Sequence, residues 1–141
     1  MKEDYLIKIE GIQTQDGEEN NISLYTKGNF VKKNGNFFIS YKETETTGFI
    51  GCTTTVKIEG NDKVSMLRYG PAPSQLIIEK GKRNVCHYET GHGSLALGIS
   101  ADGIENKLDE NGGEVNFTYQ LDLNCNCVSK NTVKIKVRPN N

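Results

Sequence analysis

Charged and aromatic side chains on the apolar side of alternating segments are the first candidates for chemistry in this sequence. Tyr41 and Glu43 continue an alternation that begins at Phe37, and Arg68 continues one that begins at Val64. Because successive side chains of a strand point to opposite faces, this parity predicts that Glu43 and Arg68 point inward. An inward charge is costly unless it is paired or hydrogen-bonded, and a guanidinium can pair bidentately with a carboxylate.

Two interpretations of these charged residues stay open. Glu43 and Arg68 form a structural pair or a solvated rim, or they form the polar end of a ligand pocket where Arg68 receives a carboxylate or phosphate. Under the second interpretation, the candidate ligand-binding residues are polar and aromatic side chains carried on strands: Arg68, Glu43, Tyr41, Tyr88 and Tyr119.

The two histidines and four cysteines do not assemble into a catalytic or metal-binding motif. No nucleophile can be placed beside His87 or His92 from the sequence, so we expect no catalytic residues and no enzyme activity. Only one residue separates Cys125 from Cys127, which is not the spacing of a zinc knuckle, and neither histidine completes a site. We expect structural cysteines, no metal and no cofactor.

The overall charge balance limits the classes of partner that we expect. The 141 residues include 17 Lys and Arg against 18 Asp and Glu, for a net charge of −1. This balance gives no electrostatic reason to expect nucleic acid or an anionic membrane as the main partner. No apolar run is long enough to cross a bilayer or to form a signal-peptide core. Homodimerisation stays undecided.

Apolar residues recur at every second position, and no segment keeps the helical spacing over three turns. Turn sequences such as Asn34-Gly35 separate the alternating segments, and short links force neighbouring strands to be antiparallel. The pattern predicts an all-β fold without a substantial helix, built from about ten strands near residues 4–13, 21–33, 36–44, 50–59, 63–69, 75–79, 84–90, 94–101, 113–124 and 131–138.

This succession of strands favours a closed antiparallel up-and-down barrel, with residues 1–141 as one domain, over a two-sheet sandwich. The first and last strands would pair to close it. The apolar parity slips at Asp102-Gly103, which predicts a β-bulge that bends a long strand, and Gly28 is a second candidate bulge. The expected core consists of Ile7, Ile9, Phe37, Ile39, Val56, Ile58, Val64, Met66, Leu95, Leu97, Val115, Phe117, Leu121 and Ile135.

Short motifs along the whole chain resemble the uncharacterised YwiB-like family of bacterial β-barrels, which is lipocalin-related (calycin-type). The motifs are Tyr41-Lys42-Glu43, Thr53-Thr54-Thr55-Val56-Lys57, Arg68-Tyr69-Gly70, Tyr88-Glu89-Thr90 with Gly93, Gly112-Gly113 and Tyr119-Gln120-Leu121. The resemblance implies a cytoplasmic single-domain barrel. It supplies no catalytic residues, because the family has no established activity.

Two functional hypotheses follow for a barrel of this size. The first is non-catalytic binding of a small, partly apolar and anionic molecule in the lumen, because small barrels can hold one ligand. The alternative is a filled barrel whose outer surface or rim contacts a protein partner, without a ligand. A lumen that is packed and dry, together with an exposed apolar patch, would favour the alternative.

Overall fold

The computed structural model describes residues 5–45, 49–71, 73–90 and 93–140, of which 88–90 and 93–94 by their backbone alone. The described residues form ten strands and no helix, so none is a membrane-spanning helix. The strands are β1 (Tyr5–Gln15), β2 (Glu18–Lys33), β3 (Asn36–Lys42), β4 (Thr53–Glu59), β5 (Lys63–Tyr69), β6 (Ser74–Glu79), β7 (Arg83–Thr90), β8 (Gly93–Asp109), β9 (Gly112–Leu123) and β10 (Asn126–Pro139). The all-β prediction is confirmed.

All ten strands belong to one antiparallel sheet that curls into a nearly closed barrel. Its order is β6-β5-β4-β3-β2-β1-β10-β9-β8-β7. The predicted pairing of the first and last strands is confirmed, since β1 and β10 pair from Tyr5 opposite Pro139 to Thr14 opposite Lys130. The sheet ends at β6 and β7, which no strand ladder joins. Asn84 Nδ2 of β7 donates instead to the Ile77 carbonyl of β6, at 3.3 Å.

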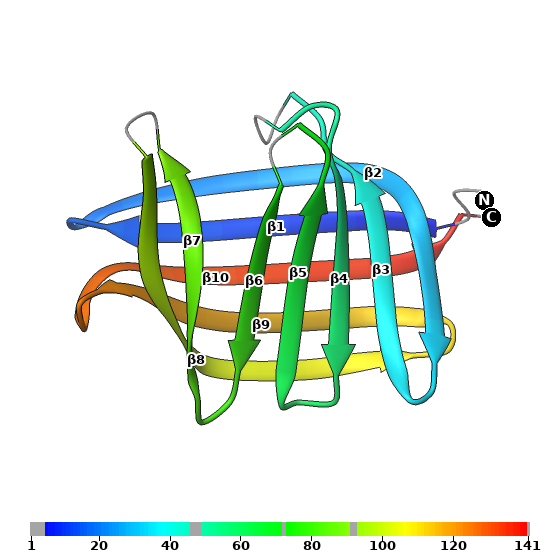
Figure 1. Cartoon of the computed structure of the whole chain (residues 1–141). Coiled ribbons are helices and arrows are strands. Elements are labelled where there is room, and N and C mark those ends of the chain that lie inside the picture. Colours follow the sequence, from blue (N-terminus) through cyan, green and yellow to red (C-terminus); the bar gives the residue numbers. More distant parts are fainter. Residues whose placement is uncertain (1–4, 46–48, 72, 91–92, 141) are drawn as a thin grey trace.

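The strands form two layers that cross at a steep angle (Figure 1). Two long strands belong to both layers. Residues 18–28 of β2 pair with β1, and residues 28–33 pair with β3. In the same way, residues 93–100 of β8 pair with β7, and residues 98–109 pair with β9. Each long strand therefore turns a corner, and the core lies between the two layers.

The two corners are built differently. The register of β8 against β9 shifts between Ala101 and Gly103, which confirms the predicted bulge. At Gly28 the register runs on unbroken on both sides, so the bulge expected there is wrong. A Cβ at Gly28 would overlap the Ser40 carbonyl oxygen and the Ile7 side chain. Gly28 therefore turns the corner by a close approach of neighbouring strands, which only glycine allows.

The core contains most of the predicted side chains, and parity selected them correctly. Phe117, Ile39 and Val56 are at most 1% exposed. Leu95 is the exception, with 39% of its surface exposed. It lies near the tip of the β7–β8 hairpin, which extends past the strands of the other layer (Figure 1). Parity predicts the face that a side chain lies on, but it does not say where the opposing layer ends.

A bidentate ion pair joins β7 to β9 across β8. Arg83 Nε lies 3.0 Å from Asp122 Oδ2, and Arg83 Nη2 lies 2.6 Å from Asp122 Oδ1. Gly98 of β8 makes room for this pair, because a Cβ there would overlap the guanidinium. Asp122 Oδ1 also accepts a hydrogen bond from the Cys125 amide at 3.1 Å. The pair therefore fixes β7 and the β9–β10 turn to the same carboxylate.

The Asp122–Arg83 pair predicts a stability difference that depends on pH. The hydrogen bonds and charge of Arg83 lower the pKa of Asp122 below its usual 3.8. A lowered native pKa stabilises the fold above the unfolded-state pKa, and this contribution is lost as the pH falls through the native value. We expect Asp122→Asn to be less stable than wild type near neutral pH, with the difference shrinking below about pH 4. Urea midpoints measured across this range check it; a difference that persists at the lowest pH would contradict it.

Candidate functional site

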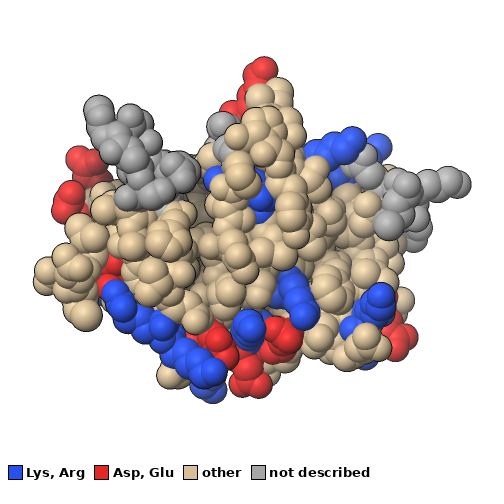
Figure 2. All heavy atoms as spheres, viewed as in Figure 1, with Lys and Arg blue, Asp and Glu red and all other residues tan. Residues whose placement is uncertain are grey.

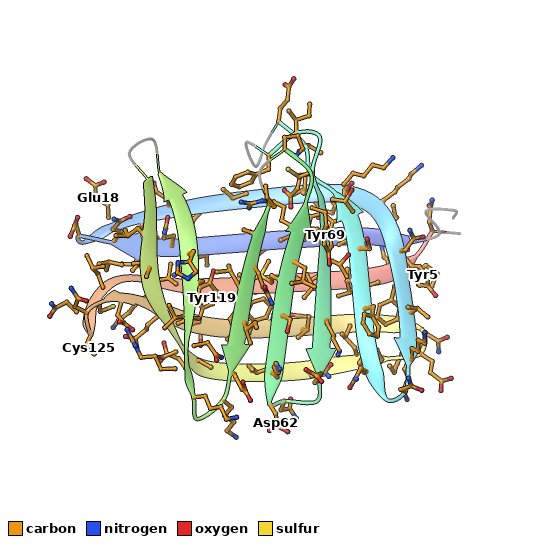
Figure 3. All side chains as sticks on the ribbon, viewed as in Figure 1. Tyr5, Glu18, Asp62, Tyr69, Tyr119 and Cys125 are labelled. Carbon is orange, nitrogen blue, oxygen red and sulfur yellow. The ribbon has the colours of Figure 1, made fainter. Side chains whose placement is uncertain are left out.

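Glu43 and Arg68 line one cavity at the end of the barrel, as their parity predicts. The cavity has a volume of about 270 Å³. Glu43 is 9% exposed, and Arg68 is half-buried. The guanidinium carbon of Arg68 lies 3.6 Å from the centroid of the Phe49 ring, a close cation–π contact. Tyr119 of β9 also lines the cavity, and it is seen between β6 and β7 in Figure 3.

Glu43 is held by a small hydrogen-bond network on β3 and β4. Thr54 Oγ1 donates to Glu43 Oε1 at 2.8 Å. Tyr41 forms side-chain hydrogen bonds with Glu43 and Thr54, and its pKa is raised, first by burial and then by the negative charge of Glu43. A raised pKa keeps the phenol protonated, so Tyr41 remains a donor at physiological pH. Tyr41 does not line the cavity and therefore positions Glu43 from behind.

The cavity continues into a larger hollow that forms the mouth of the barrel. This hollow has a volume of about 680 Å³, and strands β1, β2, β5, β6, β7, β9 and β10 contribute to its wall. The cavity and the mouth share six residues: Ile22, Phe49, Arg68, Ser74, Leu76 and Tyr119. Pockets for small molecules are mainly apolar, with a few polar groups that fix the orientation. The apolar walls and the polar inner end have this character.

The structure places four of the five candidate residues at this end of the barrel. Arg68, Glu43 and Tyr119 line the cavity, and Tyr41 lies behind it. Tyr88 lies in β7, paired with Leu95, and its side chain falls outside the description.

Sequence reasoning selected three of the nine residues that line the cavity, and Thr54 and Phe49 are among those that it missed. Thr54 could have been found from its parity with Val56, which is buried. Phe49 lies between β3 and β4, where no alternation exists to orient it.

The cysteines and histidines that the structure describes do not form a metal-binding cluster. Cys52 and Cys86 are buried, Cys125 and Cys127 are exposed, and none forms a disulfide. Burial raises the pKa of the Cys86 thiol, which disfavours the thiolate. No cluster of three His, Cys, Asp or Glu side chains suited to a metal occurs in the described part of the chain. His87 is exposed on the wall of the mouth, and His92 falls outside the described residues.

The fold and this cavity define a class of protein: a single-sheet antiparallel barrel with a partly polar cavity at one end. Residues 7–135 match the family described as a domain of unknown function (DUF1934), and the chain belongs to this family. A curated relative is the uncharacterized beta-barrel protein YwiB of Bacillus subtilis (strain 168), 24% identical over 115 residues, which cover 82% of this chain and 79% of the relative.

The crystal structure of the ywiB protein from Bacillus subtilis has the same fold. It matches with a TM-score of 0.76 and 23% identity, over 96% of this chain and 94% of that one. The resemblance read from the sequence motifs is therefore confirmed.

Proposed function

We propose that the protein binds a small, partly apolar, anionic molecule in the mouth of its barrel and does not catalyse a reaction. The observation that carries this proposal is the position of Arg68, at the junction between an inner cavity with polar groups and a mostly apolar mouth. An arginine in such a position can bind a carboxylate or phosphate in a bidentate geometry. The volume of the mouth, about 680 Å³, lies within the range of small-molecule sites.

The polar network gives each side chain a role in this proposal. Arg68 binds the anionic group, and its contact with Phe49 holds the guanidinium toward the mouth. Glu43 carries the opposite charge in the same cavity, held by Thr54 and Tyr41. Tyr119 and Leu76 contact the apolar part of the ligand. The calycin, or lipocalin-like, type of barrel is part of the proposal, because such barrels hold one ligand in the lumen.

A cytoplasmic location is also proposed, supported by the free thiols of Cys86, Cys125 and Cys127. The filled barrel that contacts a protein partner stays the alternative, and the experiment below separates the two proposals.

The test combines native mass spectrometry with titration of anilinonaphthalene sulfonate, a small apolar anion. We expect a mass excess that is lost on denaturation, or saturable dye binding, and we expect Arg68→Ala to weaken the dye about tenfold or more. Lys107→Ala removes an exposed cation from β8, away from the cavity and the mouth, and should leave the affinity unchanged. A clean mass together with no saturable dye binding would reject the lumenal site and favour the filled barrel.

A further inference from the structure

The outer face of β1, β2 and β10 concentrates basic side chains that the net charge of −1 conceals. The register places residues that lie opposite each other on the same face of the sheet. Lys8 lies opposite Lys136 of β10, and Leu6 lies opposite both Lys27 and Arg138. We use the name basic face for five side chains: Lys8 of β1, Lys27 of β2, and Lys134, Lys136 and Arg138 of β10.

Part of the basic face is concave and carries an aromatic residue. A hollow of about 430 Å³ is lined by Leu6, Lys8, Tyr25, Lys27, Lys136 and Arg138 among others. Tyr25 is 73% exposed, and Lys8 Nζ lies 5.2 Å from the centroid of its ring. Most of the Tyr25 side chain is therefore accessible to a partner in the hollow.

The arrangement of charge on this face has a cost that a bound anion would offset. Like charges directly opposite each other on neighbouring strands destabilise a sheet, and Lys8 faces Lys136 in this way. Two acidic side chains neutralise part of the charge. Glu10, with its Oε1 2.7 Å from Lys8 Nζ, lies opposite Lys134, and Glu114 of β9 lies opposite Lys136. The other layer is different: basic and acidic side chains gather together along its lower edge (Figure 2), where Lys57 and Lys63 both lie within 4.0 Å of Glu59.

We propose that the basic face binds single-stranded nucleic acid, with its lysines and Arg138 on the phosphates and Tyr25 stacked on a base. Proteins that bind single strands combine a basic surface that follows the backbone with aromatic side chains that stack on bases. Lys134, Lys136 and Arg138 recur at every second residue of β10, which spaces them at about 6.8 Å along one line. Such a line suits an extended polyanion.

Two other anionic partners fit less well. A membrane surface requires several exposed apolar anchors. Among the residues that line the hollow Tyr25 is the one large apolar side chain that is exposed, since Leu6 is half-buried. An acidic polypeptide would use the lysines but would give Tyr25 no stacking partner. The net charge of the chain is close to zero, so the proposal of nucleic acid rests on where the basic side chains lie in the folded protein.

The test measures binding of a short fluorescent oligouridylate to the whole chain by anisotropy at several salt concentrations. Each neutralised phosphate of a single strand contributes about 0.7 to the slope of log affinity against log salt. Five contacts, one for each cation of the basic face, therefore predict a slope of about −3.5. The double variant Lys134→Glu/Lys136→Glu is expected to lose at least tenfold in affinity and to flatten the slope. Lys57→Glu/Lys63→Glu makes the same charge change on the other layer and should bind as wild type does.

Tyr25→Ala separates nucleic acid from other polyanions. Loss of one stacked base should weaken the oligouridylate about fivefold or more without changing the salt slope. Binding that is indifferent to Tyr25, or that polyglutamate or anionic vesicles reproduce equally well, would overturn the proposal. So would the absence of salt-dependent binding at low ionic strength. Arg68→Ala should leave this binding unchanged, so the proposal stands or falls separately from the lumenal site.

Discussion

Gly28→Ala is expected to lower the free energy of unfolding by about 2–3 kcal/mol, although it adds only one methyl group. The added Cβ would overlap the Ser40 carbonyl oxygen of β3 and the Ile7 side chain of β1. Ile7 can change its rotamer, but the Ser40 carbonyl belongs to the backbone of the neighbouring strand. Relief would therefore require β2 and β3 to separate at the corner that joins the two layers.

Urea denaturation of a matched pair of variants tests this explanation. Gly11 lies in β1 with no atom close to the position of a Cβ. Gly11→Ala should therefore be neutral, or stabilising by about 0.5–1 kcal/mol, because alanine loses less conformational entropy than glycine on folding. Gly28→Ala with the stability of wild type would show that the bend of β2 does not depend on this close approach.

Phe117→Ala is expected to cost about 3–5 kcal/mol, a large part of the total stability of about 5–15 kcal/mol that is usual for a domain. Phe117 is 1% exposed, and it extends inward from β9 into the core between the layers. Removing its ring would leave a cavity that the surrounding side chains can fill only in part. Val31→Ala, at a position that is 53% exposed, should stay within about 0.5 kcal/mol of wild type.

The same residue connects the core to the candidate site. The Phe117 ring stacks on Tyr119, with centroids 6.3 Å apart and planes 23° apart, and Tyr119 lines the cavity. We expect Phe117→Leu to fold and to weaken dye binding, because Tyr119 loses its stacking partner. Thermal melts and dye titration of this variant provide the check. Unchanged dye affinity would separate the core from the site and remove Tyr119 from the binding contacts.

Alternation predicted the strands and the inward faces because a pleated strand has only two faces. This is why Glu43 and Arg68, which are distant in sequence, were both expected inside before their position was known. The same rule placed Val56 and Ile58 in the expected core, and both are fully buried. Where a side chain follows a strand in regular register, local sequence is sufficient.

Features that depend on two distant segments could not be predicted in this way. The ion pair of Arg83 with Asp122 spans 39 positions and requires the empty space at Gly98. Phe49 reaches Arg68 from a connection that has no periodicity. The missing ladder between β6 and β7 is also invisible locally, because the link between them looks like the other hairpin turns.

Because β6 and β7 are not paired with each other, the chain could be opened between them without breaking a ladder. Eight of the nine ladders join strands that are neighbours in sequence, and the ladder between β1 and β10 alone is non-local. Most of the contact order of the fold therefore resides in one pairing. This pairing closes a loop that contains nearly the whole chain, which costs conformational entropy. A circular permutant that links Tyr5 to Pro139 and opens at Gly81 would keep every ladder. Its strands would then follow one another in the order of the sheet, so the same barrel would form from local hairpins only.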